Sequence, residues 1–122
     1  MNIKWKRMRK NIPEYIHCGN NRKFHVVFLP KEEMPKTKNN KPLYGITTFN
    51  PNIIKINKDV DDKHIVLTFW HEFLHTFCIY KQLSFTEKQV MALERRFPFF
   101  YNFFMIVFNN KDIFEGKANN EK

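Results

Sequence analysis

The sequence predicts a single α+β domain in which a small antiparallel sheet packs on a long apolar helix, with a second helix behind it. Three observations lead to this fold class: short β-branched and aromatic runs before residue 58, a run from 64 to 80 without Gly or Pro, and a capping motif at 86–89. A chain of 122 residues fits one domain. Its composition, 43% apolar and 16% aromatic, is typical of a folded globular protein.

The first half of the chain supplies the predicted sheet. Residues 1–23 form a basic, weakly patterned segment, and FHVVFL (24–29) then reads as a strand ended by Pro30. The proline-rich stretch 30–42 reads as a loop. LYGITTF (43–49), the turn NPN and IIKIN (53–57) together predict a β-hairpin.

The second half supplies the predicted helices. The aspartates of DVDD (59–62) are suited to cap a helix that runs from His64 to about Tyr80 and is apolar on most of its sides, as a buried helix is. KQLS (81–84) reads as a turn. TEKQ (86–89) carries a capping-box signature and opens the second helix, which Pro98 should kink or end. The polar tail 109–122 is expected to fray.

The net charge of +9 is concentrated in the first third of the chain. Residues 1–42 hold eleven Lys and Arg against three Glu, whereas residues 43–122 are almost balanced. Such a bias is found in proteins that contact nucleic acid or an acidic protein, although a solvated face is the more ordinary interpretation. Part of it also matches an AT-rich coding bias, which favours Lys, Asn, Ile and Phe.

Several features together predict a cytoplasmic protein. The basic N-terminus is not followed by the apolar stretch of a signal peptide. The run FPFFYNFFMIVF (97–108) is too short to span a membrane and reads as a core helix, so no transmembrane segment is expected. Cys18 and Cys78 belong to no CxxC pair, which indicates reduced thiols without a disulfide framework.

The chemistry is concentrated in WHEFLH, which contains the pattern H-E-x-x-H as His71, Glu72 and His75. Residues four apart lie one above the other on a helix, so both imidazoles can reach one metal ion. Glu72 lies one step round the helix, where it can contact a water on that metal and act as general base. Two histidines and a glutamate buried without partners would cost several kcal/mol. The pattern therefore predicts a zinc ion.

The third protein ligand is not given by the motif itself. The extended form HExxHxxGxxH is absent, because Cys78 and Lys81 stand at its later positions. Glu87 and Glu94 on the second helix are the candidates. A simple antiparallel helical hairpin turning at 81–84 would place Glu94 opposite the histidines and Glu87 nearer the turn. Geometry alone therefore favours Glu94 but leaves both open.

From about Tyr44 to Phe104 the chain resembles a family of small phage and prophage zincin metallopeptidases. The shared elements here are YGITTFN, IIKIN, HEFLH and LSFTEKQVMAL. The last is also similar to the helix of ImmA/IrrE-type metallopeptidases whose glutamate is the third zinc ligand, which implies Glu87. Glu94 departs from the small residue usual at its position.

That resemblance implies a phage- or bacterium-encoded zinc metallopeptidase acting on a protein or peptide in the host cytoplasm. His71, His75 and Glu87 would hold the metal and Glu72 would be catalytic. Zincins bind extended peptide along an edge strand, here 43–49 or 53–57. Residues 1–43 add little to the resemblance, so the family says least about the basic third of the chain.

Other polar residues have weaker cases. Cys78 lies on nearly the same helix face as the histidines, although a buried cysteine is usually a small hydrophobe. His64 is two turns before His71 and should lie at the surface. His17 and His25 show no ligand spacing, and Tyr44 and Tyr80 are more typical of packing than of oxyanion binding.

Two other functions stay open. One is a zinc-stabilised, non-catalytic module whose basic N-terminal third contacts nucleic acid or an acidic protein. The other is a hydrolase with a non-peptide substrate.

Overall fold

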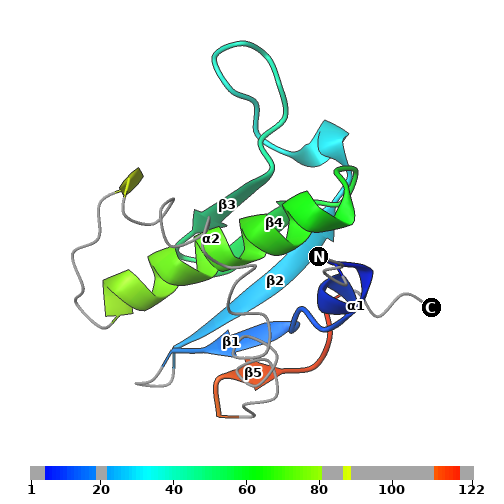
Figure 1. Ribbon diagram of the computed structural model, residues 1–122. Helices are drawn as coiled ribbons and strands as arrows, with labels where there is room; N and C mark the ends of the chain where they lie inside the picture. The colour runs from blue at the N-terminus through cyan, green and yellow to red at the C-terminus, as the bar shows by residue number, and fades with distance from the viewer. Residues whose placement is uncertain (1–4, 19–21, 81–86, 89–111, 119–122) are drawn as a thin grey trace.

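The computed structural model describes residues 5–18, 22–80, 87–88 and 112–118, with backbone alone for 77–80. Within these residues the chain forms a five-stranded sheet with helices packed against it, which confirms the predicted α+β class (Figure 1). The second predicted helix is described only at Glu87 and Lys88, which are helical. The predicted core run 97–108 and the expected kink at Pro98 lie outside the described residues.

The sheet is mixed, so the prediction of an antiparallel sheet is wrong. Its strand order is β3-β4-β2-β1-β5, and β2 (Lys23–Leu29) pairs with β4 (Ile53–Asn57) in parallel. The predicted hairpin is confirmed, because β3 (Gly45–Thr48) pairs with β4 antiparallel. The long connection 30–44 explains the difference. It carries the chain from the end of β2 to the start of β3 at the same end of the sheet, past the position that β4 fills between them. β3 therefore runs antiparallel to β2, and β4, which is antiparallel to β3, runs in the same direction as β2.

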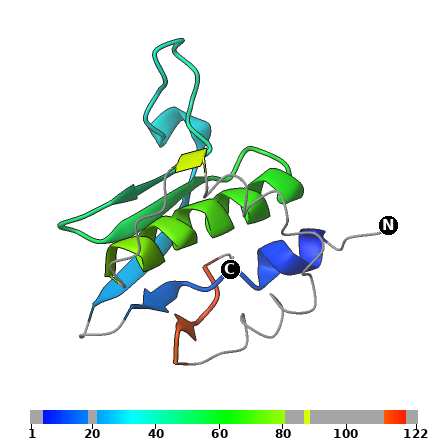
Figure 2. The ribbon, with the colours of Figure 1, turned by 60° about the vertical axis from the view of Figure 1, so that its left-hand side comes forward.

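That connection includes a short 3-10 helix, η1 (Lys31–Glu33), and projects away from the sheet (Figures 1 and 2). It is tied down at its start, where the Lys31 backbone N–H donates to the Asp59 carboxylate at 2.9 Å. An isolated bridge between Lys36 and Pro42 closes the projecting part.

Residues 1–23 contain more structure than the sequence indicated. They include α1 (Trp5–Lys10) and β1 (Tyr15–His17), and the fully buried Met8 fixes α1 to the core. A six-residue helix and a three-residue strand are too short to show a hydrophobic period, which is why pattern analysis missed them.

The tail also departs from the prediction. Within 112–118 it forms β5 (Phe114–Glu115), which pairs with β1, and Phe114 is 5% exposed in the core. The expectation that the tail frays is therefore wrong for these residues.

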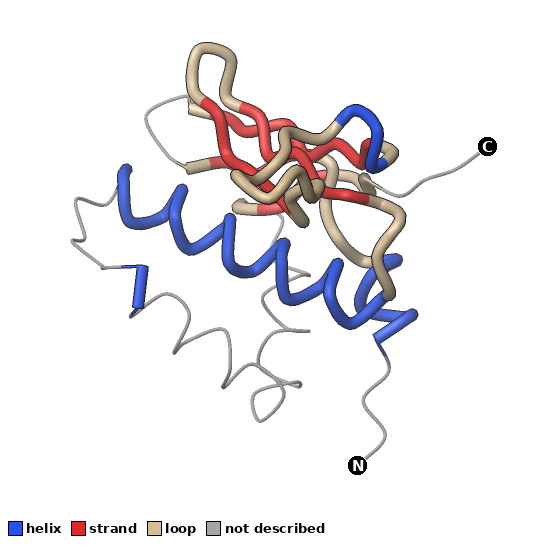
Figure 3. The backbone as a smooth tube through the Cα atoms, turned by 90° about the horizontal axis from the view of Figure 1, so that it is seen from above, coloured by secondary structure: helices blue, strands red, loops and turns tan. Residues whose placement is uncertain are grey.

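The long helix α2 (Asp62–Tyr80) lies along one side of the sheet and contacts α1, β3 and β4 (Figure 3). Its buried side chains meet those of the strands, whose alternate residues point to the same face. This core consists mainly of Ile16, Phe24, Val26, Ile54, Ile56, Ile65, Val66, Phe69, Trp70 and Phe73. The prediction of a largely buried helix is confirmed. None of the helices in the described ranges combines the length and apolar character that crossing a membrane requires.

Candidate metal centre

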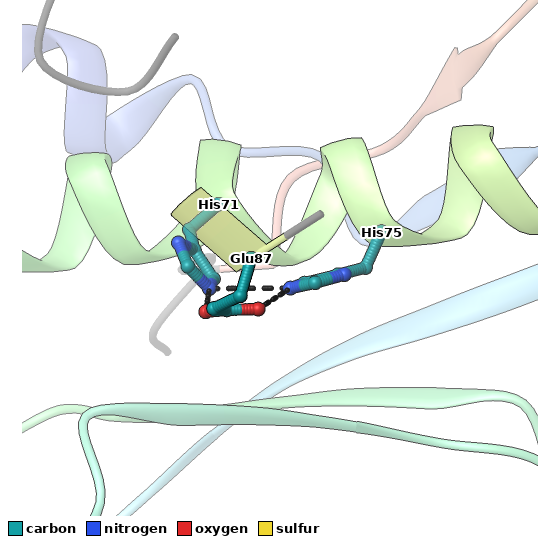
Figure 4. Close-up of side chains that lie close together, drawn as sticks. All are labelled: His71, His75 and Glu87. Carbon is teal, nitrogen blue, oxygen red and sulfur yellow. Dashed lines mark hydrogen bonds and ion pairs between the residues drawn. The ribbon is translucent and has the colours of Figure 1, made fainter. Parts of the chain in front are cut away.

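The two histidines of the motif lie on the same side of α2, as their spacing of four predicts. Their Nε2 atoms are 3.3 Å apart, and the rings meet at 68° with centroids 4.9 Å apart. Both side chains are partly buried, with 18% of His71 and 32% of His75 exposed. The two nitrogens thus face one shared point at the surface of the helix (Figure 4).

Glu87, which lies outside α2, faces the same two nitrogens with its carboxylate. One carboxylate oxygen, Oε1, lies 2.9 Å from His71 Nε2, and the other, Oε2, lies 3.0 Å from His75 Nε2. Figure 4 shows the carboxylate spanning the two imidazoles. Of the two candidates for a third ligand, Glu87 is therefore the one brought to the histidines, whereas Glu94 lies outside the described residues.

The three side chains fit a small divalent ion. One donor atom from each lies within 4.8 Å of the others, and no other described His, Cys, Asp or Glu joins a group of this kind. Two nitrogens bound to a tetrahedral zinc at about 2.0–2.1 Å are about 3.3 Å apart, which is the Nε2–Nε2 distance observed. Two imidazoles and one carboxylate are also a donor set that suits zinc.

Glu72 lies beside this group but takes no part in it. Its Oε2 is 3.9 Å from His71 Nε2, beyond the distance of a hydrogen bond. Its Oε1 accepts a hydrogen bond of 2.8 Å from the Thr47 hydroxyl on β3. The residue is 8% exposed, so this single strong bond holds a buried carboxylate in one orientation.

Gly45 permits the close approach of β3 to α2 on which that bond depends. A Cβ atom at this position would lie 2.3 Å from Thr68 Cγ2 and 3.5 Å from Glu72 Cγ. Any side chain would therefore push the strand off the helix. Sequence reasoning missed both Thr47 and Gly45. A glycine inside a strand pattern, which often marks close backbone approach, was the available signal.

The remaining histidines lie elsewhere, as expected. His64 is exposed in the first turn of α2, where its backbone N–H donates to Asp61 Oδ1 at 2.9 Å. That hydrogen bond, together with one from the His64 ring, lowers the pKa of Asp61. Asp61 is thus the N-terminal cap predicted from DVDD.

On the sheet, His17 lies 3.0 Å from Glu115, and His25 lies 3.6 Å from Glu14. The side chains of Cys78 and Tyr80 are outside the described part of the structure.

Comparison with known proteins found no relatives: no protein-family model, curated protein or solved structure matches the chain.

Proposed function

We propose that the protein is a zinc-dependent metallopeptidase in which His71, His75 and Glu87 hold the ion and Glu72 transfers protons. The observation that supports this most strongly is the convergence of three donor atoms within 4.8 Å, with a second carboxylate, that of Glu72, beside them. Catalytic zinc sites use three protein ligands and keep one position for water or substrate. When bound, the ion would supply Lewis acidity that makes water a nucleophile at neutral pH.

Glu72 is suited to be the general base and then the general acid. Its Oε1 is held by the Thr47 hydroxyl, which leaves Oε2, on the His71 side, to take a proton from water. The same oxygen can return that proton to the amine that leaves when a peptide bond breaks. Because the carboxylate is buried and oriented in advance, little reorganisation accompanies the transfer.

The sheet favours an extended peptide as substrate. Of the two strands considered, β4 is hydrogen-bonded on both sides, whereas β3 is an edge strand. The backbone groups on the outer side of β3, which pair with no strand in the described part of the chain, can bind a peptide by strand addition. Thr47 brings this edge next to Glu72, so a peptide paired with β3 would pass the group that performs the chemistry.

Metal analysis of protein purified without chelator tests the ligand set. We expect one zinc per chain in the parent and in Glu94→Gln, and a strongly reduced content in Glu87→Gln. A neutral imidazole pair donating to Glu87 would give the same side-chain contacts without metal. If the parent protein is purified without zinc and binds none when zinc is added, the metal site is excluded. If only Glu94→Gln loses its zinc, the third ligand is Glu94 instead of Glu87.

A Glu72→Gln variant tests the chemistry separately. Gln keeps the shape of the side chain and can still accept a hydrogen bond from Thr47, but it cannot take a proton. We expect hydrolysis of a proteome-derived peptide library to fall by about 10²–10⁴-fold, with zinc content unchanged. Equal cleavage by parent and variant would exclude the assignment of Glu72.

The alternative of a zinc-stabilised binding module has one observation in its favour. Helix α1 exposes Lys6, Arg7 and Lys10, while Arg9 forms an ion pair of 2.8 Å with Asp62. A module of this kind would bind nucleic acid with an affinity that falls steeply as salt increases. If the protein is such a module, charge reversal at Lys6, Arg7 and Lys10 should abolish that binding, and the parent should cleave no peptide in the library. A hydrolase with a non-peptide substrate would instead cleave ester or amide compounds but no peptide in the library.

A further inference from the structure

Two large hydrophobic side chains are exposed among the described residues, Tyr44 at 50% and Phe49 at 43%. In the sequence they stand directly before and directly after β3, the strand labelled at the sheet edge in Figure 1. Single exposed aromatics are common on protein surfaces, but these two flank the strand that also contacts Glu72.

The edge strand β3 carries no charged side chain. Edge strands are normally protected from other chains by charged residues, especially lysine. The segment 43–54, which contains all of β3, carries no charged residue, although the chain has 21 Lys and Arg and 12 Asp and Glu. No strand among the residues that the structure describes pairs with the outer side of β3, so this edge suits an uncharged, extended segment.

Contacts along β3 establish how the two aromatics are placed relative to the candidate centre. Tyr44 meets His64 in the first turn of α2, with ring centroids 5.4 Å apart. Gly45 then faces Thr68, and Thr47 bonds to Glu72, so the strand and the helix advance in the same direction.

Two residues of strand, about 6.6 Å, match about four residues of helix. By this measure Phe49 lies near the level of Thr76, one residue beyond His75, and its ring meets that of Phe24 on β2 with centroids 5.7 Å apart. Along α2, Tyr44 and Phe49 therefore lie on either side of Glu72.

We propose that Tyr44 and Phe49 form two apolar subsites for a peptide paired with β3. The peptide would carry bulky apolar side chains about five residues apart, or about 16 Å in extended form. Thr47 lies three residues from Tyr44 and two from Phe49. The cleaved bond would therefore lie between the two apolar side chains. This inference rests on the proposed peptidase function, which it deepens by naming the substrate class.

Kinetics with the zinc-loaded protein test the subsites. The probes are a synthetic ten-residue peptide with Leu at two positions five apart and the same peptide with Ser at both. Tyr44→Ser and Phe49→Ser should each lower kcat/KM for the Leu peptide by about tenfold. Tyr44→Leu and Phe49→Leu should largely restore it, because they keep an apolar surface.

Tyr15→Ser serves as the matched control. It removes a partly buried aromatic from β1, in the other half of the same sheet, and should leave kcat/KM unchanged. Equal kcat/KM for the two peptides in the parent, or unchanged values in both Ser variants, would overturn the subsites.

A binding measurement separates this failure from failure of the proposed function. Glu72→Gln is titrated with the two peptides carrying a fluorescent label, alone and combined with Tyr44→Ser or Phe49→Ser. If no peptide is cleaved but the Leu peptide binds in a way that needs both aromatics, the peptidase proposal fails and the subsites stand. If peptides are cleaved but Tyr44→Ser and Phe49→Ser leave peptide binding unchanged, the subsites are excluded and the peptidase proposal is not affected. Absence of binding contradicts the subsites.

Discussion

Strand β3 ends one edge of the sheet with the uncharged residues Gly45–Thr48, whereas β5 ends the other edge with only Phe114 and Glu115. On the β5 side, Phe114 is buried in the core and Glu115 pairs with His17 at 3.0 Å. On the β3 side, Thr47 instead contacts Glu72, and exposed aromatics stand at both ends of the strand.

The difference shows how a small sheet can prevent pairing with other chains at one edge and leave the other edge suited to binding. A two-residue edge with a charged side chain offers little to another strand. A longer, uncharged edge is an aggregation risk unless something occupies it, and β3 is the edge that passes the candidate centre. We therefore expect changes on the β3 side to affect stability and hydrolysis together, and changes on the β5 side to affect stability alone.

The largest effect is expected from Gly45→Ala. The added Cβ would lie 2.3 Å from Thr68 Cγ2, so the strand must move away from α2. We expect the free energy of unfolding to fall by about 1–3 kcal/mol and hydrolysis to be nearly lost, because Thr47 leaves Glu72. Urea unfolding and peptide assays measure the two effects.

Two further variants sharpen this prediction. Adding Thr68→Ser removes the closest atom and should recover part of both losses, although Lys55 O remains at 3.3 Å. Gly116→Ala, next to β5, forces an L residue to φ +69° and should cost about 1–2 kcal/mol while hydrolysis persists. Equal loss of hydrolysis in both single glycine variants would contradict the comparison.

Thr47→Val should come next in effect on hydrolysis. It keeps the shape of the side chain but removes the hydroxyl that donates to Glu72 at 2.8 Å. We expect kcat to fall by about tenfold, equivalent to about 1.4 kcal/mol, with KM little changed, and Thr47→Ser to restore it. Thr48→Val is the control, because its hydroxyl bonds instead to the carbonyls of Pro51 and Ile53. The same fall in both valine variants would point to a general weakening of β3.

Asp61→Ala tests the anchor at the start of α2, where His64 meets Tyr44. Loss of the cap should reduce the free energy of unfolding at pH 7 by about 1 kcal/mol. The folded-state pKa of Asp61 is lowered, so its charged form stabilises the fold above the unfolded pKa and loses this effect as pH falls through the folded pKa.

The difference in the free energy of unfolding between the parent and Asp61→Ala should therefore become smaller below about pH 4. Asp61→Asn should keep the cap without this pH dependence. If unfolding curves give the same difference in free energy from pH 7 to pH 2, the charge of the Asp61 carboxylate is not its cause.

The smallest effect is expected at the histidine–carboxylate pair of β1 and β5. Glu115→Gln removes the ion pair with His17, whose side chain is 36% exposed. Exposed pairs contribute little, so we expect a loss of less than about 1 kcal/mol that disappears in high salt, with hydrolysis unchanged. Reduced hydrolysis in this variant would show that the two edges are not independent.

Local patterns were sufficient for much of the candidate centre. The spacing of His71 and His75 determined that they share one side of a helix, and DVDD determined where that helix is capped. The hairpin followed from two β-rich runs separated by a turn. Glu87 was expected from a resemblance, since helix spacing by itself favoured Glu94.

By itself, then, the sequence determined the features that depend on near neighbours: the helix, its cap, the hairpin and the pairing of two imidazoles. Only the tertiary structure decided that β4 runs parallel to β2, that α1, β1 and β5 complete the domain, and that Thr47 holds Glu72 across the gap that Gly45 keeps narrow. The physical reason is that hydrophobic period and capping act within a few residues. Strand order and side-chain contacts instead depend on which distant surfaces fit together, and short elements leave no period from which that fit can be predicted.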